Sequence, residues 1–162
     1  RWKSTDVTCI DDRLRDLVRQ MFDLMYEAKG IGLAANQVAL PLRLFIMNPS
    51  GDREDAESEM VFINPEIVSR KGSELGEEGC LSLPEVYSEV RRAKEIVVEA
   101  YDLDGNGFEL TVDELPSRVI QHETDHLDGV MFTDRVSESA QKEIAQVLVD
   151  FEAVFRRDQF EV

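Results

Sequence analysis

Hydrophobic positions near the start of the chain recur at intervals of three and four residues. The positions that share this stripe are Leu14, Leu17, Val18, Met21, Leu24, Met25 and Ala28. Because side chains three and four apart lie on one face of a helix, the pattern predicts an amphipathic helix from about Asp11 to Lys29. Gly30 follows directly and is expected to end it.

The next hydrophobic segments are short and rich in β-branched and aromatic residues, which is typical of strands. Two of them, 43–48 and 61–68, each meet a proline and flank an acidic loop, GDREDAESE. Further along, apolar and polar residues alternate through EIVVEAY (95–101), and DGNG separates this run from FELTV (108–112). Glycine and asparagine tolerate turn conformations with positive φ, so these two runs predict a β-hairpin.

The helical period returns in the last third of the chain. It predicts a helix from Leu115 to Asp128, with Thr111 and Glu114 as a candidate capping box. A final helix is predicted over about 138–155. The fold class is therefore α+β, with small antiparallel or mixed sheets packed around a central helix and a further helix at the C-terminus.

The composition narrows the class of protein. A chain of 162 residues that is 43% hydrophobic suits a single domain spanning residues 1–162. Its 34 acidic and 18 basic residues give a formal charge of −16, which repels phosphate backbones and anionic lipid head groups, so we expect neither nucleic acid nor a membrane as a partner. Two cysteines cannot form a disulfide framework, and no apolar run approaches the roughly 18 residues of a membrane span. We expect a soluble intracellular protein.

Both histidines of the chain lie in QHETDHL (121–127), four positions apart. On a helix this spacing places His122 and His126 on one face, one turn apart, where they can bind the same metal ion. Glu123 is offset by one position and can reach a water molecule near that ion, as the general base of a hydrolase does. The alternative is a chance HExxH pattern in a surface helix.

A catalytic metal usually needs a third protein ligand and an open coordination position. The chain has no third histidine, which leaves Cys80, Cys9 or a carboxylate. Cys80 is favoured because Gly79 and Pro84 frame an extended segment, GEEGCLSLP (76–84), that can present a thiolate. Two alternatives stay open: Cys80 as a small buried hydrophobic residue, and Cys80 as a nucleophile with a histidine as its base.

Two further patterns resemble binding motifs but lie in the wrong context. GIGLAA (30–35) matches the GxGxxA dinucleotide fingerprint, yet it follows a predicted helix and precedes a strand, so the helix N-terminus that binds phosphate is missing. Its glycines more simply allow bare backbone to approach a ligand, with the Gln37 amide nearby as a donor. The acidic stretch 102–113 nearly matches a calcium loop, but it lies between two predicted strands rather than two helices.

GIGLAANQ, EEGCLSLP and QHETDHL, in this order, resemble the three motifs of the peptide deformylases. The resemblance extends from about Arg13 to Phe132 and is closer to the bacterial and organellar metal-dependent enzymes than to any protease. Those enzymes remove the formyl group from the N-terminal methionine of nascent chains. The resemblance therefore implies a deformylase that releases formate, in the bacterial cytoplasm or in an organelle.

The resemblance also implies which residues form the site. They are Cys80, His122 and His126 as metal ligands, Glu123 as general base and then acid, and the Gln37 side chain and Leu81 backbone N–H as oxyanion donors. The family usually prefers ferrous iron, and a ligand set of one cysteine and two histidines also suits zinc, nickel or cobalt.

Substrate binding is implied in the same way. Backbone around Ile31 and Gly32, and on the other side Gly79, would hold the peptide as an added strand. Arg92 matches a position that contacts the peptide further along. Ile31 and Val119 would line the pocket for the methionine side chain.

The chain also departs from the family pattern. The family normally begins with a strand and a proline-containing segment before its first helix, and this chain starts close to that helix. Some bacterial members carry a basic C-terminal helix that docks on the ribosome, whereas residues 138–162 hold six acidic and three basic residues, so ribosome contact through this tail is not expected. Two alternative functions remain, an HExxH metallopeptidase with a carboxylate as third ligand and a catalytically idle homologue that binds peptides.

Overall fold

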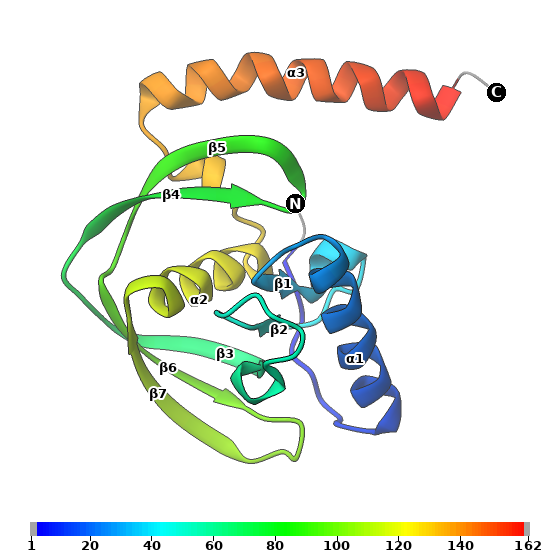
Figure 1. Ribbon diagram of the computed structural model, residues 1–162, viewed down its shortest axis with the longest axis vertical. Coiled ribbons are helices and arrows are strands. Elements are labelled where there is room, and N and C mark those ends of the chain that lie inside the picture. The colour runs from blue at the N-terminus through cyan, green and yellow to red at the C-terminus, as the bar shows by residue number, and fades with distance from the viewer. Residues whose placement is uncertain (1–2, 161–162) are drawn as a thin grey trace. The chain divides into compact units, whose positions relative to one another are not determined.

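The computed structural model describes residues 3–160 (Figure 1). The chain forms two compact units. The first contains the residues up to Glu74 together with Arg92–Met131, and the second contains Leu75–Arg91 together with the residues from Phe132 onward. In the described part of the chain, no helix is long and apolar enough to cross a bilayer.

A five-stranded antiparallel sheet, in the order β1-β2-β3-β6-β7, is the framework of the first unit. Its strands are β1 (Gly32–Ala34), β2 (Leu44–Met47), β3 (Met60–Lys71), β6 (Glu95–Tyr101) and β7 (Gly107–Asp113). The register of β3 on β6 shifts twice, between Ile63 and Glu66 and between Ile67 and Ser69. Strand β1 is an outer strand of this sheet, so one of its two edges faces away from β2.

The predicted hairpin is confirmed as β6–β7. At its turn the Asp102 carboxylate accepts hydrogen bonds from the backbone N–H groups of Asp104 and Asn106, each at 2.9 Å. Gly105 takes a φ of +81° that a side chain would disfavour. The hydrogen bond from the Asn106 N–H is the main reason why the pKa of Asp102 lies below its usual value. The Asp102 carboxylate thus stabilises the hairpin turn.

Helix α1 (Asp12–Glu27) follows the predicted hydrophobic stripe. Asp11 caps its N-terminus, where the carboxylate accepts from the Leu14 N–H at 2.9 Å. The prediction that Gly30 ends the helix is wrong by one residue, because Lys29 takes the left-handed conformation with φ of 56°. The Gly30 N–H then closes the end by donating to the Met25 carbonyl.

Helix α2 (Glu114–Leu127) carries both histidines and packs on all five strands of the sheet (Figure 1). The predicted capping box is wrong, because β7 continues as far as Asp113 and therefore includes Thr111. Asp113 is the N-cap residue, and its side chain makes no capping hydrogen bond. Directly after the helix, Gly129 takes a φ of +75°, which a side chain would disfavour.

The core of the first unit lies between α2 and the sheet. Phe45 of β2 and Phe62 of β3 stack with ring centroids 4.6 Å apart. The buried residues of this cluster are Ala34, Phe45, Met47, Phe62, Ile96, Val98, Ala100, Val119, Ile120 and Leu127. One face of α2 is therefore held by apolar packing, which leaves its other faces for polar contacts.

The second unit contains a two-stranded sheet and a long helix. Its elements are β4 (Glu74–Cys80), β5 (Leu83–Arg92), the short 3₁₀ helix η3 (Phe132–Asp134) and α3 (Glu138–Phe160). Val86, Val90, Phe132, Val136 and Ile144 form its apolar core. The predicted C-terminal helix is thus present, and it ends later than expected.

The α+β fold class is confirmed, with structural relatives described below. Strand β1 and the strands β4 and β5 were not predicted as separate elements. That the whole chain is one domain stays a prediction.

Candidate active site

The two histidines of α2 are the centre of the candidate site. His122 and His126 are one helical turn apart, and their Nε2 atoms lie 3.1 Å from each other. Two nitrogens bound to one tetrahedral cation at about 2.1 Å would lie roughly 3.4 Å apart, close to the observed separation. His126 is only 5% exposed, so the pair lies in a partly dehydrated setting. The donor chemistry and the spacing both fit a shared metal ion.

Glu123 lies against the backbone of β1. An ideal Cβ placed on Gly32 would come within 2.5 Å of Oε1 of Glu123 and 3.0 Å of a methyl group of Val119. Only a glycine leaves room for this carboxylate. Glu123 is buried, with 5% of its surface exposed. The structure therefore brings together Glu123, Gly32 and Val119, three residues that the sequence placed in the site.

Gln37 lies in the short 3₁₀ helix η1 (Ala35–Val38), directly after β1. Its Oε1 accepts a hydrogen bond from the Ala34 N–H at 2.8 Å. This bond fixes which end of the amide is the carbonyl, so the other end is the NH₂ group, which can only donate. That this NH₂ group donates to a bound ligand stays a prediction.

Asn36, which the sequence did not single out, connects η1 to the end of α2. Its Nδ2 donates a short hydrogen bond to the carbonyl of His126. Its neighbour Gln37 stood out only because of the motif, and nothing in the spacing marked Asn36 as a contact of the helix. The bond ties one metal-ligand candidate to the GIGLAANQ segment.

Ile31 is held by a loop organised around Asn48. The Asn48 N–H donates to the Ile31 carbonyl at 2.9 Å, and the buried Asn48 side chain donates to the Tyr26 hydroxyl and to two loop carbonyls. An ideal Cβ on Gly51 would lie 3.3 Å from a methyl group of Ile31, so the loop also packs on this side chain. The loop thus supports the residue predicted to line the methionine pocket.

Arg92 is almost fully buried. Its guanidinium donates to Oδ2 of Asp125 at 2.5 Å, and the side chains of the two residues are 4% and 11% exposed. Asp125 lies in α2, between Glu123 and His126. The Arg92 side chain, from the end of β5, is therefore held against α2, and its contact with peptide stays a prediction.

Cys80, Gly79 and Leu81 belong to the second unit. Cys80 is the last residue of β4, is half-buried and is not in a disulfide. The backbone of Gly79 is covered by the ring of Tyr87, because an ideal Cβ there would come within 2.6 Å of a ring carbon. Leu81 follows in the turn that leads to β5. That Cys80 shares a metal ion with the two histidines of α2 stays a prediction.

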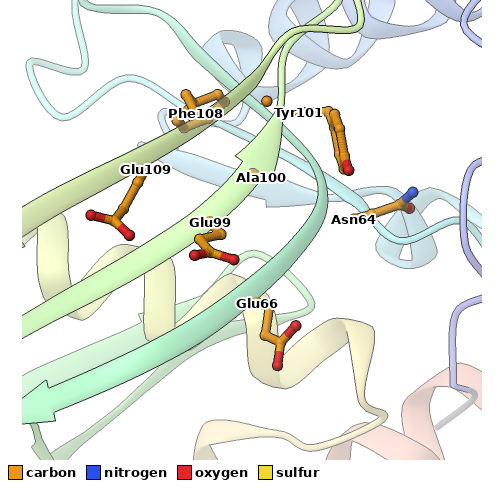
Figure 2. Close-up of a pocket in the computed structure, with 8 residues that line it drawn as sticks. Asn64, Glu66, Glu99, Ala100, Tyr101, Phe108 and Glu109 are labelled. Carbon is orange, nitrogen blue, oxygen red and sulfur yellow. The ribbon is translucent and has the colours of Figure 1, made fainter.

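A pocket of about 360 Å³ lies on the sheet and is lined by acidic side chains (Figure 2). Three carboxylates line it, and they are direct cross-strand neighbours: Glu66 of β3 pairs with Glu99 of β6, which pairs with Glu109 of β7. None of the predicted site residues lines this pocket. The carboxylate row belongs to the sheet surface rather than to the candidate active site.

Comparison with known proteins identifies the family. The family described as "Polypeptide deformylase" matches residues 1–142, which is most of the chain. The chain belongs to the polypeptide deformylase family. A relative from Rhodopirellula baltica, "Peptide deformylase", is 43% identical over 159 residues, covering 98% of this chain and 79% of the relative.

Other relatives and solved structures agree with this family. A "Peptide deformylase" from Acidobacterium capsulatum is 50% identical over 131 residues, covering 81% of this chain and 76% of the relative. A solved structure of peptide deformylase from Plasmodium falciparum superposes with a TM-score of 0.92 at 36% identity, covering 100% of this chain and 94% of the other. The chloroplastic "Peptide deformylase 1B" of Solanum lycopersicum is 41% identical, covering 94% of this chain and 54% of the relative. Deformylase relatives thus come from bacteria and from plastids.

Proposed function

We propose that this chain is a metal-dependent peptide deformylase that removes the formyl group from N-terminal methionine and releases formate. The observation that supports it most strongly is the histidine pair of α2 with Glu123 beside it, in a chain of this family. We further propose that the protein acts in the bacterial cytoplasm or in an organelle, where formylated chains are made, without a ribosome contact through its acidic C-terminal tail.

Cys80, His122 and His126 are proposed to hold one divalent cation. The two imidazoles fit by their spacing, and a thiolate completes a set typical of ferrous iron, zinc, nickel or cobalt. Ferrous iron is the proposed native ion. When bound, such a cation supplies Lewis acidity, which lowers the pKa of water and polarises a carbonyl group.

Glu123 is proposed to move the proton. A carboxylate accepts the proton of the attacking water and then donates it to the amine that leaves as the formyl C–N bond breaks. Its position against Gly32 leaves the carboxylate little freedom to turn away. Formate and a peptide with a free amino terminus are the products.

Gln37 and Leu81 are proposed to stabilise the negative charge that develops on the formyl oxygen. The bond from the Ala34 N–H sets the Gln37 amide so that its NH₂ group can donate to that oxygen. The backbone N–H of Leu81 would be the second donor. Donors that are already oriented cost no reorganisation during the reaction.

The peptide is proposed to bind as an added strand. Strand β1, which carries Gly32 and follows Ile31, is an outer strand of its sheet, so its backbone is suited to pair with an extended peptide. Gly79 lies in β4 and would pair with the peptide in the same way. Ile31 and Val119 are proposed to line the methionine pocket, and Arg92 to contact residues further along.

Formate release from formyl-Met-Ala-Ser tests the proposal, with protein loaded anaerobically with Fe²⁺ and with Ni²⁺ as the oxygen-stable control. Glu123→Gln is expected to keep the metal and to lose activity by a factor of about 10² to 10⁴. Glu27→Gln, at an exposed position of α1, is the matched control and should behave like the wild type.

Two outcomes would reject the proposal. One is full activity of Glu123→Gln or of Cys80→Ala, and the other is no formate release from wild-type protein with a full complement of metal. Cleavage of an internal peptide bond that tolerates Cys80→Ala would instead support the metallopeptidase alternative.

A further inference from the structure

One face of α2 carries three polar residues that all contact a single short segment, Arg92–Ala93. Ser117, Gln121 and Asp125 are spaced four apart and therefore lie on the same side of the helix. The Ser117 hydroxyl donates to the Ala93 carbonyl at 3.1 Å, and Asp125 accepts from the Arg92 guanidinium. We call these three side chains the polar seam of α2.

Gln121 is the centre of the polar seam and pairs with both backbone groups of Ala93. Its Oε1 accepts from the Ala93 N–H at 3.0 Å, and its Nε2 donates to the Ala93 carbonyl at 2.9 Å. Ala93 lies between β5 and β6, outside both strands. The side-chain amide thus supplies the two hydrogen bonds that a neighbouring strand would otherwise give.

The rest of the Gln121 amide is also engaged inside the helix. Nε2 lies 3.0 Å from the Ser117 hydroxyl oxygen and 3.1 Å from the Ser117 carbonyl. Gln121 is 6% exposed and Ser117 fully buried, so water cannot replace these bonds at little cost. The amide therefore has one well-defined position relative to both the helix and Ala93.

The hydrogen bonds between Gln121 and Ala93 restrict the rotation of α2 about its own axis, which apolar packing restricts poorly. The opposite side of α2 packs Val119, Ile120 and Leu127 on the sheet, and hydrophobic contact has no directional preference. Small rotations of the helix about its axis cost such packing little, whereas they break a pair of hydrogen bonds to one peptide group. His122 and Glu123 directly follow Gln121, so the rotation of α2 sets where both side chains point.

We propose that Gln121 is a positioning residue, which fixes the rotation of α2 so that His122 and His126 converge on one metal ion and Glu123 faces Gly32. The inference rests on the site roles proposed above. Gln121 acts through the helix and does not touch the metal or the substrate. Hydrogen bonds from Asn36 to His126 and from Glu114 to Lys94 hold the ends of α2, while Gln121 holds its middle.

Gln121→Met tests this role, because methionine keeps the volume and the helix propensity and removes both bonds to Ala93. The matched control is Thr124→Val, a buried residue of the same helix whose hydroxyl donates to the Ile120 carbonyl at 2.7 Å. That bond stays inside the helix, so its loss lowers stability without freeing the rotation of α2.

Cobalt binding gives a readout that is independent of turnover. For Gln121→Met we expect the Co²⁺ dissociation constant to rise about tenfold or more, and the visible absorption of the Co²⁺ protein to change. We also expect kcat to fall about tenfold with KM within about twofold, because the substrate edge of β1 is untouched. Thr124→Val should lower the unfolding midpoint and leave the Co²⁺ affinity, the spectrum and kcat close to wild type.

Two results would overturn the proposal. They are a wild-type Co²⁺ affinity and spectrum in folded Gln121→Met, and an equal loss of Co²⁺ affinity in Thr124→Val. If Gln121→Met does not fold, Gln121→Asn makes the same test, because its amide is one methylene short of Ala93. If the wild type binds Co²⁺ but releases no formate, the proposed function fails while the cobalt arm still decides the role of Gln121.

Discussion

In Gln37, one hydrogen bond determines which end of the side-chain amide accepts and which end donates. Because its Oε1 accepts from the Ala34 N–H, replacing the amide removes a donor whose direction is already set. We predict that Gln37→Leu lowers kcat by a factor of about 10² to 10³ with a smaller effect on KM. Gln20→Leu, on the exposed side of α1, is the control, and steady-state kinetics with formyl-Met-Ala-Ser is the measurement. A kcat within threefold of wild type would remove Gln37 from the oxyanion site.

Tyr26 is expected to make stability depend on pH at the alkaline end. Burial is the main cause that raises the pKa of Tyr26, and its hydrogen bond to Glu59 raises it further, while the hydrogen bond from Asn48 lowers it. A raised pKa means that the folded state favours the protonated phenol. This contribution is therefore present below about pH 10 and is lost as the pH rises through the higher pKa of the folded state.

Urea unfolding between pH 8 and 11 checks this expectation. The unfolding free energy of the wild type should fall more steeply above about pH 10 than that of Tyr26→Phe, which has no phenol to ionise at this position. Tyr101→Phe, at an exposed tyrosine of β6, should keep the wild-type slope. Equal slopes in wild type and Tyr26→Phe would contradict the assignment.

At this scale the sequence indicated the candidate site residues better than the residues that contact them. His122, Glu123 and His126 followed from the helical spacing alone, because few other functions use two histidines four apart. Gln121, Ser117 and Asn36 did not, because their partners are backbone groups of Ala93 and His126, and the sequence does not show which backbone groups lack a partner within their own element.

Among the elements, the three-stranded part of the sheet carries an unfavourable charge arrangement. Glu66, Glu99 and Glu109 are direct cross-strand neighbours, and like charges in that relation repel (Figure 2). We predict that Glu99→Lys raises the unfolding free energy by about 0.5 kcal/mol, since it converts two repulsive pairs into attractive ones. Urea unfolding at low ionic strength is the measurement.

The control for this substitution is Glu57→Lys, which changes the net charge equally at an exposed position of the short 3₁₀ helix η2 (Ala56–Ser58). The gain in unfolding free energy of Glu99→Lys over this control should shrink at about 1 M NaCl, where exposed charges are screened within roughly 3 Å. If Glu99→Lys is no more stable than the control at low salt, the carboxylates are too well hydrated to repel one another.

Element boundaries were predicted less well than element types, for local reasons. The capping-box prediction failed because Thr111 lies in β7, whose pairing with β6 continues to Asp113. Strand β1 has three residues, all buried, so it shows no alternation to read in the sequence. The hairpin β6–β7 and the helices were predictable, because their periodicity extends over several turns or pairs.

For the molecule as a whole, the formal charge of −16 is the dominant long-range property. A field of this sign attracts cationic peptides and repels anionic ones. We predict that at low ionic strength kcat/KM for formyl-Met-Lys-Lys exceeds that for formyl-Met-Gln-Gln severalfold, and that the ratio approaches one at about 0.5 M salt. A ratio that does not change with salt would mean that local contacts, rather than the field, set the preference.

The family relationship decides among the functions that the sequence left open. Each relative named above is described as a peptide deformylase, and none supports the metallopeptidase or the idle homologue. The identity of the ion stays a prediction because the proposed ligand set suits several metals. The expected lack of a ribosome contact through the tail also stays a prediction, because only the charge of the tail argues for it.

The histidine pair also gives the protein a built-in spectroscopic label. The chain contains no histidine other than His122 and His126, so every imidazole signal in a ¹H–¹⁵N NMR spectrum originates from one turn of α2. Metal titrations, inhibitor binding and the tautomer of each ring can therefore be followed without assigning the rest of the protein. In most proteins of this size such signals would first have to be separated from those of unrelated surface histidines.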